Sequence, residues 1–570
     1  MSSPGAEALA VRHSLDRLEW QSRVLAEHPR RLDLLRLAPS WPTREIRVRV
    51  HRNTPVEYVT SLAGPFLAYA GLSAVFELSD YDDSLAALDA VDPGPDVEVV
   101  WLDHTRYDHL AADEVADWLI GRITALRTRT TAPVLVVDRP GDDDRARLLR
   151  DRLSGFGTVL PDVAVADLGA VAARLGDAFT DTRLQAVGGT ALSSAATVLV
   201  AQRLGLRWLP VATGVRVKAV AVDLDMTLYD GVLGEDGPRG VTLTDGHADL
   251  QRVLRGLADD GVLLAVVSRN EPADVEELFR LRPDFPLRWS DFSARAVGWG
   301  AKSQGVAAVA ADLRIAPDAV VFVDDNPGEL AEVAAGTTVA GLVQAGDPRA
   351  TATALGLFPG LHGHVRTTED RLRATDLAAA TTRAAAATTD PASYLASLDV
   401  RIDLALDARE DLDRVADLAA RTNQFNVSLG RTPAAAFARW MAAADAGVVT
   451  ARLRDRLSDS GLVAVVAGRR DDDGGLLVEE AFISCRALGR GVEDVLLAAA
   501  VERLLDLAST PGVRLRYRPG PRNEPARAWL RRRTADPVVD AADVLVDWGP
   551  QECRTVVADS PVTLHWEDRT

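Results

Sequence analysis

Residues 217–231 (VKAVAVDLDMTLYDG) constrain the fold more than any other stretch of the chain. The apolar run from Ala219 to Val222 predicts a fully buried strand of a parallel sheet. The run ends abruptly at Asp223, and Asp225 follows two residues later. Ligands of open α/β sheets bind at the carboxyl ends of the strands, where both carboxylates are expected. A solvated acidic turn is the alternative, and the neighbouring sequence decides between the two.

Strands and helices alternate after this stretch, which predicts a parallel sheet with its strand ends at one edge. A second apolar strand ends at Ser268, and a third ends in the acidic pair Asp324 and Asp325. Lys302 opens a helix between them and is one of only two lysines in the chain. Two acidic pairs, a hydroxyl and an ammonium are therefore expected at the same sheet edge, which favours a phosphoryl-transfer site over a solvated turn.

With 570 residues, the chain is too long for a single hydrophobic core. The fold class predicted from the element order is α/β with a C-terminal α+β region. We expect a doubly wound docking domain of SGNH- or flavodoxin-like type, with a leading helix, at 1–212. A central α/β domain follows at 213–368, then an alanine-rich helical connector at 369–397 and an acyltransferase-like α+β domain at 398–570.

The first domain offers four polar candidates at its predicted strand ends, without a serine nucleophile at the end of the first strand. These candidates are His51, Asp103, His104 and Asp138. No convincing catalytic triad can be assembled from them, so a recognition or docking role is favoured.

Charge and composition exclude several classes of partner. The net charge of −19 argues against nucleic acid and anionic membranes, although a local basic patch could still bind an acidic carrier protein. The N-terminus lacks the apolar run of a signal peptide, and no segment reaches membrane-spanning length. The only cysteines are Cys485 and Cys553, which suits a reducing compartment. A cytoplasmic location is therefore expected.

The groups at the central sheet edge, taken in order, resemble the four motifs of the haloacid dehalogenase (HAD) superfamily. A carboxylate can attack phosphorus to form an aspartyl-phosphate, and this role falls to Asp223. Asp225 would protonate the leaving oxygen and later activate water. Ser268 would bind a phosphoryl oxygen, and Lys302 would neutralise its charge. Three further residues beside these motifs are phosphate-binding candidates: Thr227, Arg269 and Asn270.

The same motifs predict a Mg²⁺ site, because Mg²⁺ prefers an octahedron of oxygen ligands. The expected ligands are the Asp223 carboxylate, the backbone carbonyl of Asp225 and the Asp324 carboxylate, with Asp325 nearby.

A second informative stretch is FISCRALGRGVE, in which a predicted strand leads into a glycine loop and then a helix. Glycine loops at helix N-termini present backbone N–H groups to phosphate. The loop resembles the pyrophosphate-binding loop of GNAT-type acyltransferases, which implies that Arg486, Gly489 and Gly491 hold the phosphopantetheine arm of a carrier protein. Cys485 precedes the loop beside Arg486 and Arg490, where positive charge favours the thiolate. We interpret Cys485 as an acyl-accepting nucleophile and Cys553, in a polar tail, as incidental.

Together the stretches DLDMTLYDGVLGEDG, GVLLAVVSRNEPADVEELF, VFVDDNP, RTNQFNVS and FISCRALGRGVE resemble the FkbH-like family of polyketide biosynthesis, which belongs to HAD subfamily IIIC. The resemblance spans about residues 215–530. It implies a bifunctional phosphatase and glyceryltransferase that dephosphorylates D-1,3-bisphosphoglycerate, a small phosphorylated three-carbon substrate. The glyceryl or related acyl group would then pass to an acyl carrier protein, with Mg²⁺ at the first site.

The sequence departs from the family pattern beside the predicted nucleophile. Met226, Tyr229 and Asp230 replace the usual residues, and Arg269 stands where a lysine is usual. The nucleophile and metal positions are unchanged, so the same type of reaction is expected, and the departures leave the identity of the donor open. Two other hypotheses stay open: a stand-alone HAD phosphatase of a small phosphate ester, and a non-catalytic scaffold that docks a carrier protein.

Overall fold

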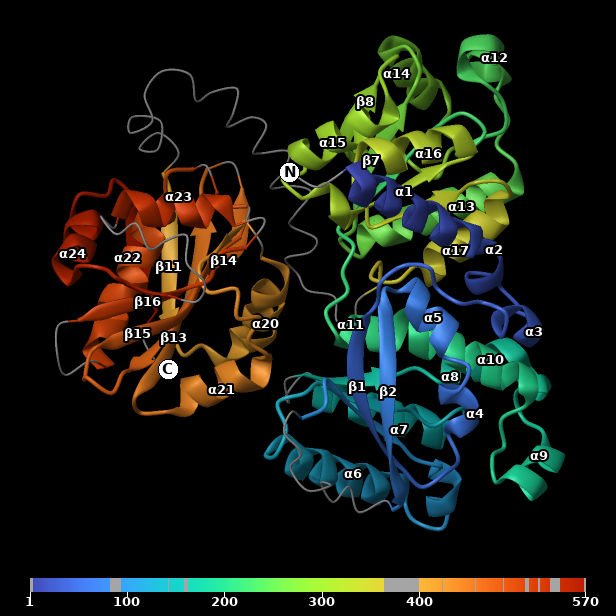
Figure 1. Cartoon of the computed structure of the whole chain (residues 1–570), viewed down its shortest axis with the longest axis horizontal. Coiled ribbons are helices and arrows are strands. Elements are labelled where there is room, and N and C mark those ends of the chain that lie inside the picture. Colours follow the sequence, from blue (N-terminus) through green and yellow to red (C-terminus); the bar gives the residue numbers. More distant parts are fainter. Residues whose placement is uncertain are drawn as a thin grey trace. The chain divides into compact units, whose positions relative to one another are not determined.

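The structure is a computed structural model of the chain, and it forms two compact units, Met1–Arg366 and Thr367–Thr570 (Figure 1). The predicted connector at 369–397 lies outside the described residues. The structure describes residues 4–82, 94–141, 143–157, 162–362, 399–422, 424–456, 458–484, 486–488, 490–507, 512–520, 523–533 and 544–567.

The first unit contains two five-stranded parallel sheets. The N-terminal sheet has the strand order β2-β1-β3-β4-β5, and every neighbouring pair is parallel. Its strands are β1 (Arg44–Arg52), β2 (Leu72–Tyr81), β3 (Val97–Trp101), β4 (Val134–Val137) and β5 (Val163–Ala166).

Helices cover both faces of this sheet, as the doubly wound prediction requires. Alternate residues of β4 show the two faces: Val134 and Val136 pack with α6 and α7, whereas Leu135 and Val137 pack with α5 and α10. The helices of this part are α4 (Glu57–Thr60), α5 (Gly64–Tyr69), α6 (Ala112–Arg127), α7 (Asp144–Gly157), α8 (Gly169–Leu175), α9 (Thr182–Gly188), α10 (Ser194–Arg203) and α11 (Leu209–Ala212), with the π-helical turn η3 (Leu204–Trp208) before α11.

The second sheet has the order β10-β9-β6-β7-β8, and it is also parallel throughout. The predicted strand at the start of this domain forms as expected, is fully buried, and lies at the centre of the sheet. The strands are β6 (Ala219–Val222), β7 (Leu263–Ser268), β8 (Phe292–Val297), β9 (Val320–Asp324) and β10 (Gly341–Gln344).

Helices also cover this sheet on both faces, with α15 and α16 on one side and α13 and α17 on the other. The glycine-rich segment after Gly231 forms a short helix, α12, which is broken at Gly237 by a positive φ of 69°. The helices are α12 (Leu233–Gly240), α13 (Asp245–Asp259), α14 (Pro272–Leu281), α15 (Lys302–Asp312), α16 (Pro327–Gly336) and α17 (Pro348–Leu357).

The leading helix, α1 (Pro4–Glu19), packs on the second sheet although the sequence placed it with the first domain. Arg17 donates a hydrogen bond to the carbonyl oxygen of Ala340 (3.0 Å), and its guanidinium lies over the rings of Tyr69 and Phe358. Tyr69 belongs to α5 of the first domain, so Arg17 joins the two sheets. Two short helices follow, α2 (Gln21–Val24) and α3 (Arg31–Leu34).

The second unit is built on one mixed sheet with the order β17-β16-β15-β14-β13-β11-β18, and β12 pairs with β15. Helix α22 covers one face, and α20 and α21 cover the other. The strands are β11 (Arg401–Leu406), β12 (Phe425–Asn426), β13 (Ala446–Arg454), β14 (Asp459–Arg470), β15 (Leu476–Ile483), β16 (Val513–Tyr517), β17 (Val544–Asp547) and β18 (Thr563–Trp566). The helices are α20 (Leu412–Arg421), α21 (Ala434–Ala442), α22 (Glu493–Leu504), α23 (Glu524–Arg533) and α24 (Pro550–Ala558).

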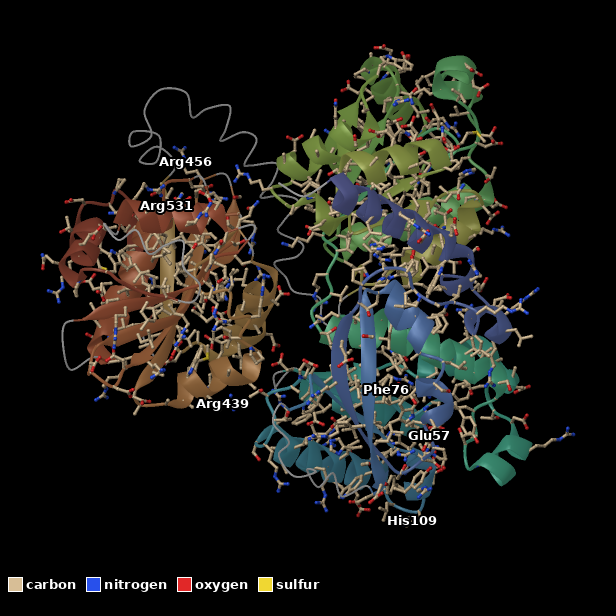
Figure 2. The ribbon with its side chains drawn as sticks, in the orientation of Figure 1. Glu57, Phe76, His109, Arg439, Arg456 and Arg531 are labelled. Carbon is tan, nitrogen blue, oxygen red and sulfur yellow. The ribbon has the colours of Figure 1, made fainter. Side chains whose placement is uncertain are left out.

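Charged side chains gather on the surfaces of both units, as Figure 2 shows for Arg439, Arg456 and Arg531 in the second unit, all of which are exposed. Within the segments described, no helix combines the length and the apolar character needed to cross a lipid bilayer.

Candidate active site

The central sheet brings the predicted functional groups to one edge. Strands β9, β6 and β7 are adjacent and parallel, so their carboxyl ends lie side by side. Asp223 follows β6, Ser268 ends β7 and Asp324 ends β9. All three side chains are buried. The apolar strands thus bring three buried polar groups to the same edge of the sheet.

Lys302 lies between two of these carboxylates. Its Nζ is 3.0 Å from Asp223 Oδ1 and 2.5 Å from Asp324 Oδ2. Lys302 is the first residue of α15 and is only 5% exposed. The first turn of α15 is tied to α16, because Ser303 donates hydrogen bonds from its backbone N–H and its hydroxyl to the Glu332 carboxylate. This contact fixes the point from which the lysine reaches the site, and the sequence analysis missed Glu332.

Three carboxylates form a cluster that suits a divalent cation. Ligand oxygens of Asp223, Asp324 and Asp325 all lie within 4.8 Å of one another. One ammonium faces the cluster, so a full set of carboxylates carries more negative charge than Lys302 can offset. Hard oxygen donors with excess negative charge are the ligands that Mg²⁺ prefers. The residues present therefore fit the predicted metal.

The electrostatics of the site reflect this imbalance. Burial raises the pKa of Asp223 to about 7, and the neighbouring Asp324 adds to the shift although Lys302 opposes it. Burial also raises the pKa values of Asp324 and Asp325. For Lys302, burial lowers the pKa, but Asp223 and Asp324 together outweigh it and the net pKa is raised. The lysine is therefore a permanent cation, and the carboxylates are costly to ionise without further positive charge.

Asp225 is held by three hydrogen-bond donors. Its Oδ1 accepts from the Tyr229 hydroxyl (2.7 Å) and from the backbone N–H of Leu233 (3.0 Å). Its Oδ2 accepts from Asn270 Nδ2 (3.0 Å), which also lies 3.1 Å from Ser268 Oγ. Oδ1 is saturated, whereas Oδ2 keeps one lone pair on which a proton can be exchanged. Tyr229, which departs from the family pattern, is thus a support for Asp225.

The loop after Asp225 presents a methionine to solvent. Met226 has a positive φ of 56° and is 44% exposed. Its backbone N–H donates to the carbonyl oxygen of Gly231, which closes the loop. Thr227 is buried behind it, and its Oγ1 accepts a hydrogen bond from the backbone N–H of Asp325 (3.2 Å). Thr227 therefore joins the first and last motifs of the site.

The side chain of Arg269 makes its contacts outside the cluster of three carboxylates. Its guanidinium pairs with Glu329 at 2.7 Å and donates to the Gly300 carbonyl oxygen at 3.3 Å. Glu329 lies in the first turn of α16. The charge of Arg269 is therefore already matched by this carboxylate. No observation tests the predicted phosphate-binding role of Arg269, which stays a prediction.

In the second unit, the arginines of the glycine loop point into the protein. Arg486 is buried and donates to the Leu462 carbonyl oxygen (3.0 Å), and Arg490 pairs with the buried Asp455 (3.1 Å). Gly491 has a positive φ of 73°. Cys485 and Gly489 lie outside the described residues. The proposed phosphate-binding roles of Arg486, Gly489 and Gly491, and the thiol chemistry of Cys485, stay predictions.

The interpretation of Cys553 was wrong in one respect. Cys553 lies on α24 and is fully buried in the apolar core of the second unit, not in a polar tail. Burial raises the pKa of its thiol to about 12, so it is an unreactive core residue.

The polar candidates of the first domain each have a structural partner. His51 contacts the buried Glu98 carboxylate at 3.0 Å, and Asp103 accepts the backbone N–H of Thr105 at the start of a 3₁₀ turn. His104 Nε2 lies 3.2 Å from the Val137 carbonyl oxygen, and Asp138 accepts from Arg150 and from the backbone of Leu168.

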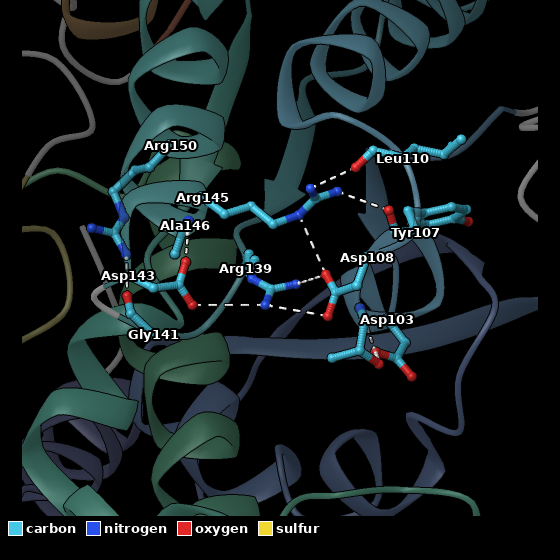
Figure 3. A network of polar contacts seen from close by, with 11 residues as sticks. Asp103, Tyr107, Asp108, Leu110, Arg139, Gly141, Asp143, Arg145, Ala146 and Arg150 are labelled. Atoms are coloured by element: carbon cyan, nitrogen blue, oxygen red, sulfur yellow. Dashed lines mark hydrogen bonds and ion pairs between the residues drawn. The ribbon is translucent and has the colours of Figure 1, made fainter.

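Near these strand ends, arginines and acids pair with one another, as Figure 3 shows for Arg139, Arg145 and Asp108. Arg145 also donates to the carbonyl oxygens of Tyr107 and Leu110. This network ties the segments that follow β3 and β4 together, and the recognition or docking role of the first domain stays a prediction.

Comparisons with known proteins give a structural likeness without a match to a family or to a curated protein. No protein-family model matches the chain, and no curated protein matches it. Among solved structures, the chain is similar to the N-terminal part of the protein BF1531 from Bacteroides fragilis, which is described as containing a phosphatase domain and as complexed with Mg. The identity is 18% and the TM-score is 0.46, over 60% of this chain and 99% of that chain. These values are too low to transfer an activity.

Proposed function

We propose that the first unit is a Mg²⁺-dependent phosphatase of the HAD type with Asp223 as the nucleophile. The observation that carries this proposal is the buried lysine held between two carboxylates, Asp223 and Asp324, at the carboxyl edge of a parallel sheet. Such an arrangement is costly for a merely structural role, since three buried ionisable groups must be desolvated. It matches a site in which a phosphoryl group meets a nucleophile and a cation.

The reaction proceeds in two displacements. A carboxylate oxygen of Asp223 attacks phosphorus, the bond from phosphorus to the leaving oxygen breaks, and Asp225 gives its proton to that oxygen. Asp225 then takes a proton from water as the water oxygen attacks the aspartyl-phosphate. The bond between phosphorus and Asp223 breaks, which releases inorganic phosphate and restores both carboxyl groups.

The other residues orient and neutralise. Lys302 offsets charge on the phosphoryl oxygens, and Ser268 donates its hydroxyl to one of them. Tyr229, Leu233 and Asn270 hold Asp225 so that Oδ2 can exchange the proton. When bound at Asp223, Asp324 and Asp325, Mg²⁺ supplies the positive charge that draws an anionic substrate to an acidic site.

For the whole chain, we propose that the substrate is an acyl phosphate of the 1,3-bisphosphoglycerate class and that Asp223 removes its ester phosphate. The acyl group passes to the phosphopantetheine thiol of an acyl carrier protein in two exchanges. The Cys485 thiolate attacks the acyl carbon and the bond from that carbon to the acyl-phosphate oxygen breaks, with phosphate leaving; the carrier thiolate then attacks the same carbon and displaces Cys485. The support is the resemblance of five stretches to the FkbH-like family, together with a second unit that has its own core and a mixed sheet. Cys485 is the proposed acyl relay in this scheme.

The test is to incubate the protein with Mg²⁺, D-1,3-bisphosphoglycerate and a holo-carrier protein. The intact mass of the carrier is then measured by mass spectrometry. A glyceryl mass gain supports the complete scheme. Phosphate release without loading supports a stand-alone phosphatase. The absence of both phosphate release and loading supports a non-catalytic scaffold. Asp223→Asn is expected to abolish release of the ester phosphate, whereas Cys485→Ala should abolish loading and leave that release intact. Phosphate release at the wild-type rate by Asp223→Asn would overturn the assignment of the nucleophile.

A further inference from the structure

Trp299 is a large apolar side chain that lies in solvent at the edge of the central sheet. It follows β8 and exposes 72% of its surface. The backbone N–H of Gly298 donates to the Ser268 carbonyl oxygen (3.0 Å), so the loop that carries Trp299 begins level with the end of β7. Strand β8 is the neighbour of β7, and β7 is the neighbour of β6. Trp299 therefore belongs to the same sheet edge as the Asp223 cluster.

The indole of Trp299 is held in place although it is exposed. Its Nε1 donates a hydrogen bond to Glu271 Oε1 (2.7 Å), and Glu271 is the N-cap residue of α14. The carbonyl oxygen of the next residue, Gly300, accepts a hydrogen bond from Arg269 Nε (3.3 Å). The loops after β7 and β8 are thus joined by two hydrogen bonds. A ring that is already fixed loses little conformational entropy when a ligand packs on it, so this arrangement prepares Trp299 for contact.

A second exposed apolar side chain belongs to the loop after β6. Met226 directly follows Asp225 and is exposed like Trp299. Between these two loops lies the loop after β7, where Asn270, the residue before Glu271, donates a hydrogen bond to Asp225 Oδ2 (3.0 Å). The three loops therefore form one row along the sheet edge. Met226 and Trp299 stand at its two ends, and the contact between Asp225 and Asn270 lies in the middle.

The position of Asp225 in the proposed reaction indicates what passes over this row. Asp223 is buried and Asp225 is only half-buried, so the leaving group extends past Asp225 toward solvent. Apolar carbon atoms of a leaving group gain from contact with the indole, and an aromatic ring gains further from stacking on it and from contact with the thioether. A carboxylate in the same place would be repelled by the exposed Glu271. The row therefore suits a leaving group that is uncharged and rich in carbon.

We propose that Trp299 and Met226 form a leaving-group subsite, and that the Asp223 site hydrolyses phosphate monoesters whose leaving group is uncharged and carries an aromatic ring or a hydrocarbon chain. This inference rests on the proposed phosphatase site and extends its substrate class beyond the three-carbon donor. The bond from phosphorus to the leaving oxygen breaks, the alcohol departs with the proton of Asp225, and water restores Asp223 as inorganic phosphate is released. Trp299 determines specificity and takes no part in the proton transfers.

The first test measures binding without chemistry, by isothermal titration calorimetry of the full chain in Mg²⁺. It compares 3-phenylpropylphosphonate with propylphosphonate, two analogues that carry the same charge and cannot be hydrolysed. The wild type should bind the phenyl analogue about tenfold more tightly, and Trp299→Ala should lose most of that difference. Trp299→Phe should keep part of it, because an aromatic face remains. Equal affinities for the two phosphonates in the wild type, or an unchanged ratio in Trp299→Ala, would overturn the inference.

Turnover separates this inference from the proposed function. With 3-phenylpropyl phosphate and propyl phosphate as substrates, the phenyl ester should have the lower KM in the wild type, and Trp299→Ala should remove this advantage with kcat changed by less than about twofold. The matched control is Val75→Ala, an exposed apolar residue of β2, which should alter neither KM nor the phosphonate affinities. Phosphate release with equal KM for both esters would refute the subsite and leave the phosphatase. No release from either ester, with binding that still depends on Trp299, would refute the phosphatase and leave the subsite.

Discussion

Tyr229 shows how a single residue can tune the acid–base group of the site. Its ring is fully buried and stacks on Phe285, while its hydroxyl donates to Asp225 Oδ1. Tyr229→Phe removes only the hydroxyl. We expect kcat to fall about tenfold with KM nearly unchanged, and the free energy of unfolding to fall by about 1 kcal/mol, the value of one hydrogen bond.

Steady-state kinetics and urea unfolding of the Tyr229→Phe variant check this expectation. Tyr69→Phe is the matched control, because Tyr69 is equally buried but lies in the first domain near Arg17. An unchanged kcat for Tyr229→Phe would show that the Leu233 and Asn270 bonds suffice to place Asp225.

At the scale of elements, the contact between α15 and α16 positions the lysine. The carboxylate of Glu332 on α16 accepts two hydrogen bonds from Ser303, the residue after Lys302. Glu332→Ala should loosen the first turn of α15 and displace the ammonium from the line between Asp223 and Asp324. We expect kcat to fall about tenfold to a hundredfold, because small displacements of a catalytic group are costly.

A fall in kcat without a change in KM distinguishes a loss of positioning from a general loss of stability. In Glu332→Ala, kcat should fall while KM stays within about twofold, and Glu332→Gln should recover part of the loss because its amide oxygen still accepts one bond. Asp312→Asn, at the opposite and exposed end of α15, should leave both constants unchanged. Equal losses in Glu332→Ala and Asp312→Asn would argue against a specific anchor.

At the scale of the whole molecule, the excess of carboxylates predicts how stability depends on pH. In the metal-free folded protein the pKa of Asp223 is about 7, whereas an unfolded aspartate has a pKa near ~4. The folded state therefore binds more protons between these values, and its free energy of unfolding falls as the pH rises through the interval. The loss attributable to Asp223 is about 2–4 kcal/mol.

Thermal unfolding in EDTA between pH 5 and pH 8 tests this expectation, with each buffer repeated in Mg²⁺. Mg²⁺ should flatten the decline, because it stabilises the ionised carboxylates. Asp223→Asn should show a shallower decline in EDTA than the wild type. An identical slope in the two proteins would show that Asp223 is not the titrating group.

The hydrophobic core of the first unit is continuous across its two sheets. Apolar residues of α5, α10 and η3 belong to the same buried cluster as β6 and β9. We therefore expect a fragment of residues 1–366 to fold cooperatively and keep phosphatase activity, whereas a fragment of 213–366 should be unstable or aggregate, because it exposes that shared core. Circular dichroism and phosphate release on both fragments check this, and an active, stable 213–366 fragment would contradict it.

Much of the second sheet and its edge could be predicted because the signals are local. An apolar run followed by a polar residue defines both a strand and its functional end, so Asp223, Ser268 and Asp324 could be located before any contact was known. The sequence pattern did not indicate β2 and β5 of the first sheet or the helix α12 that follows Gly231. These elements are short or contain polar residues, so their local hydrophobic pattern is weak. Packing against neighbouring elements of the fold stabilises them.

Local pattern alone determined the α/β alternation, the order of the motifs and the chemical type of each group at the sheet edge. Only the tertiary structure decided which groups pair: Lys302 with Asp223 and Asp324, and Arg269 with Glu329. The reason is physical. Periodicity depends on neighbours along the chain, whereas the energy of a charge depends on burial and on partners far away in sequence, which exist only once the chain has folded.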